Sequence, residues 1–187
     1  MAQTWRVTGY RSSSGRAASA RPPLDSAAAE RLALFYVGRY ATTRARLRDY
    51  LHRKLRERGA GAPPPDVDAI VSRMAALGYV DDASFAAARA AGLQRRGYGA
   101  RRIGQALRGA GIDEEDAAAA QDGISEGGWD AAIAFARRRR IGPFAAAPAD
   151  PDQRRRALGA LMRAGHSLAD ARRIVSAPPG TIPERDG

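Results

Sequence analysis

Apolar residues recur at helical spacing along most of this chain. The clearest example is a stripe that follows Asp66: Val67, Ile70, Val71, Met74 and Leu77. Residues spaced i, i+3, i+4 and i+7 lie on one face of a helix, and an aspartate just before such a stripe can accept hydrogen bonds from the first free amides. No segment shows the sustained alternation typical of strands. We therefore expect an all-α protein.

Two further helices are predicted upstream of this stripe. The first begins at Asp25 or Ser26 and the second near Thr43, and the segment 59–65, rich in glycine and proline, ends the second. Their expected buried positions are Leu32, Phe35, Tyr36 and Tyr40 in the first helix, and Leu47, Tyr50, Leu51 and Leu55 in the second. Residues 25–80 are thus predicted to form a three-helix unit.

The central part of the chain carries the same signals. Gly78 suits a left-handed helix end, Asp81 or Asp82 can cap the next helix, and Phe85 begins its apolar face. Gly97 and Gly99 then interrupt the chain before another apolar stripe: Ile103, Ala106, Leu107 and Ala110. A third helix follows, capped by Asp113, with acidic residues at its positive end: Glu114, Glu115 and Asp116.

The last part of the chain also divides into three helices. We expect one over residues 129–140, a second opened by Asp150 and Pro151, and a third opened by a Ser167 and Asp170 capping box. Expected buried residues of the second are Leu158, Leu161 and Met162.

An internal repeat supports this division. Residues 107–117 align with residues 161–171 without a gap, so that Ala110 and Gly111 fall on Ala164 and Gly165. Tandem helical units of about 50 residues stack on their neighbours. We expect an elongated, curved array of three three-helix (helix-turn-helix-like) repeats. The predicted parts are a disordered basic arm (1–24), three repeats (25–80, 81–127 and 128–177) and a C-terminal tail (178–187).

Composition narrows the class of protein. The 187 residues include no cysteine and no apolar run long enough for a membrane span, and residues 1–23 lack the apolar segment of a secretory signal. We expect a cytoplasmic monomer that does not contact membranes. A net charge of +11 and a pI near 11.1 favour a polyanionic or acidic partner. A GC-rich codon bias toward arginine and alanine is the alternative source of part of this charge.

Signals of catalysis are weak. His52 and His166 have no second histidine at metal-ligand spacing, and the acidic clusters at 81–82 and 114–116 are explained by helix capping. The sequence at Gly97 and Gly99 is not a dinucleotide-binding loop, because Arg102 occupies the third glycine position and a helix precedes it. We predict no catalytic residue, no metal site and no cofactor.

A binding surface is the remaining prediction. Each repeat carries a basic cluster, and residues 93–111 contain no acid. Tyr98 has two interpretations: stacking on a base or a partner, or covering the turn in which it lies. The candidate partner- or DNA-binding residues are Arg44, Arg48, Arg95, Arg96, Tyr98, Arg101, Arg102, Arg137, Arg138, Arg139, Arg140, Arg154 and Arg155.

Two ordered motifs resemble the signature of the RecX family, bacterial regulators of the RecA recombinase. Residues 78–86 read Gly-Tyr-Val-Asp-Asp-Ala-Ser-Phe-Ala, and residues 95–112 contain Arg-x-Gly-Tyr-Gly-x-x-Arg-Ile-x-x-x-Leu-x-x-x-Gly-Ile. The segment 33–37, with Arg39, Thr43 and Leu47, is similar to the family's first segment, although Tyr40 and Thr43 replace a basic residue and a serine. The similarity covers residues 26–176 and weakens after Gly128.

This resemblance implies a non-enzymatic regulator of homologous recombination and DNA repair. RecX-like proteins have three tandem helical units, bind in the groove of the RecA filament across neighbouring subunits, and usually inhibit ATP hydrolysis and strand exchange. Single- or double-stranded DNA is a further candidate partner. The alternative is a helix-turn-helix transcription regulator, whose recognition helix would enter a major groove. Against it, the basic clusters spread over the whole chain and no segment supplies an obvious dimer interface.

Overall fold

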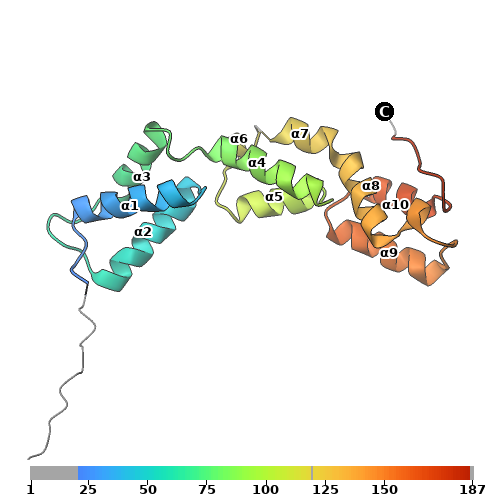
Figure 1. Ribbon diagram of the computed structural model, residues 1–187, viewed down its shortest axis with the longest axis horizontal. Coiled ribbons are helices and arrows are strands. Elements are labelled where there is room, and N and C mark those ends of the chain that lie inside the picture. Colours follow the sequence, from blue (N-terminus) through green and yellow to red (C-terminus); the bar gives the residue numbers. More distant parts are fainter. Residues whose placement is uncertain (1–20, 119, 186–187) are drawn as a thin grey trace, which may run out of the picture.

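The computed structural model describes residues 21–118 and 120–185, and the first 20 residues of the predicted basic arm lie outside the described part. Within that part the chain is helical, and its one β-type contact is an isolated bridge between Leu24 and Ala60. The helices form an elongated, curved row of three groups, each following the previous one along the chain (Figure 1). The predicted all-α array of three tandem repeats is confirmed.

The first group consists of α1 (Ser26–Arg39), α2 (Arg44–Arg58) and α3 (Val67–Ala76). The three helices begin at the predicted positions. The side chains of Asp25, Thr43 and Asp66 cap them by accepting hydrogen bonds from amides of the first helical turn. The main buried residues are Leu47, Leu51, Ile70, Val71 and Met74. Leu24, the last residue of the predicted arm, is also fully buried in this core.

Three apolar positions predicted to be buried in this group are exposed. Phe35, Tyr40 and Leu77 are 65%, 50% and 58% exposed. The buried face of α1 is formed by Ala29 and Ala33 instead, and Phe35, two residues after Ala33, points to the opposite side. Tyr40 and Leu77 follow the last residues of their helices, so neither continues its apolar stripe.

The second group contains α4 (Asp82–Arg95), α5 (Ala100–Arg108) and two short helices, α6 (Glu114–Ala118) and α7 (Gln121–Glu126). Asp81 caps α4 and Asp113 caps the turn of α6, as predicted. The core includes Ile103, Leu107, Ile112 and Ile124. Both short helices pack on α4, whereas α6 makes little direct contact with α5.

The third group contains α8 (Gly128–Arg139), a 3-10 turn η1 (Gly142–Phe144), α9 (Pro151–Arg163) and α10 (Leu168–Ser176). Asp150 opens α9 with a full capping box, and Ser167 caps α10. Leu161 is buried as predicted, whereas Leu158 and Met162 lie at the edge of the core. The chain after α10 turns back over the α8–α9 loop, where the Gly180 amide donates to the Pro143 carbonyl at 2.9 Å.

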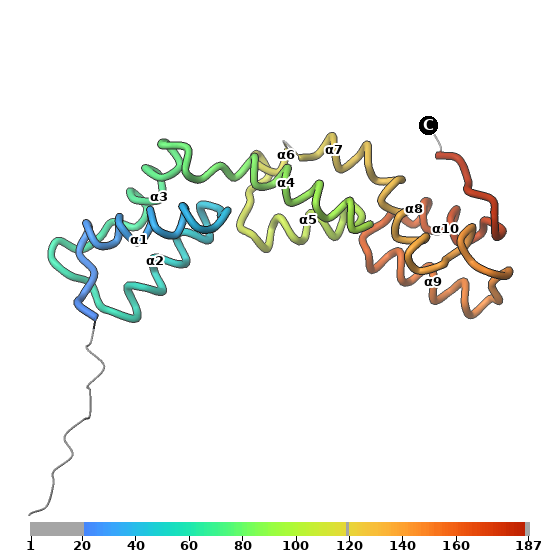
Figure 2. The backbone as a smooth tube through the Cα atoms, viewed as in Figure 1, coloured from blue at the N-terminus to red at the C-terminus, as the bar shows by residue number. Residues whose placement is uncertain are grey.

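Successive groups touch through their turns, as the backbone trace shows (Figure 2). At the first joint, between the first and second groups, the start of α2 meets the turn after α5. At the second joint, between the second and third groups, the start of α5 meets the turn after α9. The acceptors of the hydrogen bonds at the two joints are the carbonyl groups of Ala110 and Ala164, two residues that align with each other in the internal repeat.

Candidate partner-binding surface

The glycines at 97 and 99 allow the second joint to form. Gly97 has a positive φ of 74°, and a Cβ atom there would lie 2.9 Å from the backbone nitrogen of Phe135 in α8. A Cβ atom on Gly99 would overlap the carbonyl group of Gly165. This close approach lets the Gly99 amide donate to the Ala164 carbonyl at 2.9 Å. Both glycines are therefore required by backbone contact between groups.

His166 is a buried structural residue at the same joint. It is 2% exposed, its Nε2 atom lies 3.0 Å from the Gly97 carbonyl oxygen, and its ring meets the edge of Phe135. Burial lowers the pKa of His166, and the Gly97 contact and Asp170 only partly oppose this effect. The neutral ring with its proton on Nε2 donates to the carbonyl.

Basic side chains from two groups converge beside this joint. The end of α4 contributes Arg96, the following turn contributes Tyr98, and the last turn of α8 contributes Arg138 and Arg139. Together with Phe135 they line a recess of about 320 Å³. The guanidinium group of Arg139 lies 5.8 Å from the centre of the Phe135 ring. Residues about 40 positions apart in the sequence thus form one cationic surface.

Within the part of the chain that the structure describes, no carboxylate lies within 4.0 Å of the guanidinium groups around this joint. These groups belong to Arg95, Arg96, Arg101, Arg102, Arg138 and Arg139, which we call the joint arginines. Arg101 and Arg102 form the exposed first turn of α5. Unpaired cations attract anionic groups more strongly than ion-paired ones. The joint arginines are therefore the strongest candidates for a binding surface.

The other predicted arginines occupy different surroundings. Arg48 lies 2.6 Å from Asp68, and Arg155 pairs with Asp152 within α9. Arg137 lies over the Phe144 ring at 5.1 Å. Arg140 ends α8 in a left-handed conformation and Arg154 is exposed on α9. These residues are not gathered into the surface at the second joint.

Tyr98 is half-buried and packs against the hydrophobic cores of both the second and the third groups. Of its two interpretations, this position corresponds to covering the turn. The aromatic ring contributes apolar contact between groups and forms one wall of the basic recess.

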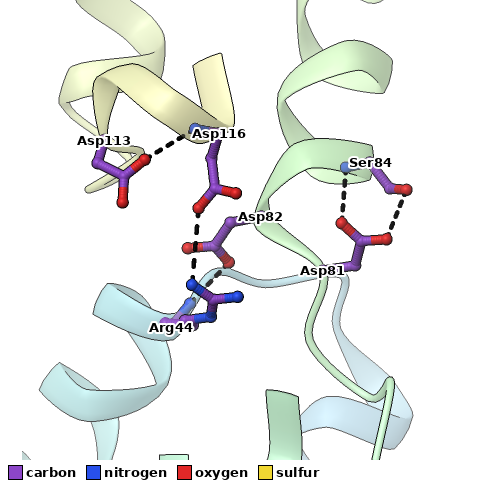
Figure 3. A network of polar contacts seen from close by, with 6 residues as sticks. All are labelled: Arg44, Asp81, Asp82, Ser84, Asp113 and Asp116. Atoms are coloured by element: carbon purple, nitrogen blue, oxygen red, sulfur yellow. Dashed lines mark hydrogen bonds and ion pairs between the residues drawn. The ribbon is translucent and has the colours of Figure 1, made fainter. Parts of the chain in front are cut away.

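Arg44 belongs to a polar network at the first joint (Figure 3). Its backbone amide donates to Asp82 Oδ1 at 2.9 Å, and its guanidinium lies 3.7 Å from Asp116 Oδ2. Asp82 is 4% exposed, and burial raises its pKa, with Asp116 and Asp113 adding to the effect and Arg44 opposing it. Sequence reasoning missed this role of Asp82. The sequence did contain a signal for it. Two adjacent aspartates, Asp81 and Asp82, precede α4, and capping a helix uses only one carboxylate, so the second is available for another contact.

The described ranges 21–118 and 120–185 contain no cluster of histidine and carboxylate side chains that could hold a metal ion. No helix in them has the length and apolar character needed to cross a membrane.

Known proteins resemble this chain over most of its length. A family model described as RecX, second three-helix domain, matches residues 81–120. The regulatory protein RecX of Myxococcus xanthus is 34% identical over 163 residues, covering 80% of this chain and 85% of that protein. The same protein of Thermobifida fusca is 36% identical over 173 residues, covering 86% and 88%.

The fold is similar as well. The crystal structure of RecX from Lactobacillus salivarius superposes with a TM-score of 0.58 at 20% identity, covering 80% of this chain and 93% of that one. The identities, the coverage and the three-group architecture lead to one conclusion: this chain belongs to the RecX family of regulatory proteins.

Proposed function

We propose that this protein binds the RecA recombinase filament and slows its ATP hydrolysis and strand exchange, without chemistry of its own. Membership of the RecX family supports the regulatory role, and the resemblance described for the sequence implies RecA as the partner. The observation that carries the proposal is the set of joint arginines, which have no acidic partner among the described residues.

The shape of the molecule supports binding to an extended partner. Three groups in a row present their surfaces along one curved body (Figure 1). Such arrays use their length to contact several sites of a partner at once. An array with basic clusters in each of the proposed units 25–80, 81–127 and 128–177 can bridge neighbouring filament subunits and hinder the changes that accompany ATP hydrolysis.

Charge supports fast capture of that partner. A net charge of +11 steers the chain toward acidic protein surfaces and toward DNA phosphates. The joint arginines lie on two successive groups, so a ligand bound there contacts both groups. We propose them as the principal partner contacts, with Arg44, Arg48, Arg137, Arg140, Arg154 and Arg155 as secondary ones.

The test adds the purified protein to RecA on single-stranded DNA and follows ATP hydrolysis and co-sedimentation. We expect slower hydrolysis and a protein that sediments with the filament. Replacement of Arg95, Arg96, Arg101 and Arg102 by alanine should weaken both effects. A control with the same charge loss replaces four exposed arginines elsewhere, Arg56, Arg89, Arg156 and Arg172. Unchanged hydrolysis together with no co-sedimentation would refute the proposal.

A further inference from the structure

The two joints differ in the groups that hold them together. At the second joint the contact is made by the backbone: the Gly99 amide donates to the Ala164 carbonyl at 2.9 Å, and the Arg101 amide donates to the Gly165 carbonyl at 3.2 Å. The missing side chains of Gly97, Gly99 and Gly165 allow the two backbones to come this close. The main chain of one group is thus fixed directly against the main chain of the next.

Helix packing and a shared apolar residue strengthen the second joint. The helix α8 packs against both α4 and α7, and a single residue, Gly127, separates α7 from α8. Tyr98 packs against the hydrophobic cores of both groups. Separation of these groups would expose apolar surface to water, which is unfavourable. The second and third groups therefore form a single packed body.

The first joint lacks these features. Among the described residues, no hydrogen bond between backbone groups crosses it, and no residue packs against both the first and the second core. The helices of the two groups touch only at isolated points. Side chains make the polar contacts instead: the Thr43 hydroxyl donates to the Ala110 carbonyl, and the Asp82 carboxylate accepts from the Arg44 amide.

The covalent connection at the first joint is short and provides a pivot. Val80 is 3% exposed and belongs to the core of the first group, whereas Asp82 is the first residue of α4. Only Asp81 lies between them, with extended backbone at φ −133° and ψ 100°. Hinges are commonly a few residues at the ends of such elements. Rotation about this point moves the start of α2 away from the turn that contains Ala110.

Such a rotation exchanges polar contacts for contacts with water. The Thr43 hydroxyl and the Ala110 carbonyl can both bind water once they separate, so the net loss is small. The Asp82 carboxylate, which is 4% exposed, regains hydration. The Arg46 guanidinium lies 5.4 Å from the centre of the Phe85 ring, a type of contact that contributes little near solvent. The first joint is thus the weaker of the two.

We propose that the first joint is a hinge, at which the first group (residues 24–80) swings about Asp81 against a rigid body formed by the second and third groups. The swing changes the curvature of the array, while the basic recess beside the second joint keeps its shape. Hinge motion belongs to the free protein and requires no partner. A rigid first joint and a failure to bind RecA are therefore separate outcomes.

Distances between pairs of spin labels test this motion in the full chain. The sequence contains no cysteine, so introduced cysteines are the only labelled positions. Arg56→Cys in α2 with Ala87→Cys in α4 spans the first joint, and Ala87→Cys with Arg156→Cys in α9 spans the second; all three positions are exposed. Double electron–electron resonance measures the distance distribution of each pair. We expect the distribution across the first joint to be about twice as wide.

Gly111 offers a way to open the first joint. Its φ is 74°, and a Cβ atom there would overlap the side chain of Ala45 in α2. Gly111→Ala should therefore shift the first-joint distances to a new population and leave the second-joint distribution unchanged. Gly111→Ala combined with Ala45→Gly has the same backbone strain without the overlap. This double variant is the matched control and should restore the original distances.

Two results would overturn the hinge. One is an equal width of the two distributions in the otherwise unchanged chain, and the other is a folded Gly111→Ala protein whose first-joint distances match those of the double variant. Circular dichroism and thermal melting establish that the labelled proteins are folded. If Gly111→Ala fails to fold, the comparison of the two joints in the otherwise unchanged chain still decides between a hinge and a rigid row.

Discussion

The Thr43 hydroxyl donates a hydrogen bond of 2.7 Å to the Ala110 carbonyl across the first joint, and both residues are buried. At the second joint the Gly99 amide donates to the Ala164 carbonyl at 2.9 Å. In each pair the donor precedes the second helix of one group, and the acceptor ends the second helix of the next. Equivalent carbonyl groups, those of Ala110 and Ala164, thus accept a hydrogen bond from the preceding group at both joints. Because the acceptor is equivalent at both joints, the groups form a regular curved row.

Thr43→Val should destabilise the protein by about 1–3 kcal/mol, because it leaves the buried Ala110 carbonyl without a donor and removes the cap of α2. Thr43→Ser retains the hydroxyl and is the matched control, with a smaller loss. Urea unfolding measures both. A valine variant as stable as the serine variant would show that the hydrogen bond does not hold the joint.

Asp82→Asn should keep the acceptor for the Arg44 amide while removing a buried charge, so its unfolding free energy at pH 7 should equal or exceed that of the wild type. Asp82→Ala removes the acceptor and should cost about 1–3 kcal/mol. Chemical denaturation distinguishes the two variants.

The difference in unfolding free energy between the wild type and Asp82→Asn should also depend on pH, in a direction that the raised pKa of Asp82 determines. Since folding raises the pKa of Asp82 above its ordinary value of 3.8, the folded state binds this proton more tightly than the unfolded state. The stability of the wild type relative to Asp82→Asn should therefore decrease as pH rises from about 3.8 through the raised pKa. A difference that grows in the opposite direction would contradict the burial of a charged Asp82.

His166 should make the second joint sensitive to mild acid. Burial lowers its pKa below the ordinary 6.5, so below that pH the unfolded state binds a proton that the folded state resists. We expect the unfolding free energy to fall between about pH 7 and pH 5, and less steeply in His166→Gln. The exposed His52→Gln is the control. Parallel pH profiles of the wild type and His166→Gln would exclude this effect.

Leu107→Ala should cost about 2–5 kcal/mol, since the side chain is 2% exposed in the core of the second group. Leu77→Ala, at a position that is 58% exposed, should cost less than about 1 kcal/mol. Thermal or urea unfolding of the pair tests whether the apolar stripe of α5 is packed. Equal losses would contradict the assigned faces.

Alanine at Arg95, Arg96, Arg101 and Arg102 should leave helicity and melting temperature nearly unchanged, because exposed charges contribute little to stability. If DNA is the ligand of this surface, removing each arginine that binds a phosphate should flatten the dependence of log affinity on log salt by about 0.7–0.9. A protein ligand has no such fixed increment, so affinity measured against salt identifies the partner. Wild-type binding by the variant would place the interface on another part of the chain.

Local chemistry determined where the helices begin. Asp25, Thr43, Asp66, Asp150 and Ser167 all cap the helices predicted from the sequence. A capping hydrogen bond joins residues about three positions apart, so the information lies within a few neighbouring residues. The internal repeat and the absence of alternating strands likewise sufficed for the all-α tandem array.

Tertiary structure alone decided which faces are covered and which side chains meet. Phe35 belongs to a helical stripe but is exposed because Ala29 and Ala33 face the core. Arg96 and Arg138 line the same recess only because successive groups stack turn against turn. The same stacking lets Asp82 accept a hydrogen bond from the Arg44 amide. Periodicity specifies a direction around one helix axis. The contacts between groups depend on the packing angle and separation of distant helices, which no local pattern encodes.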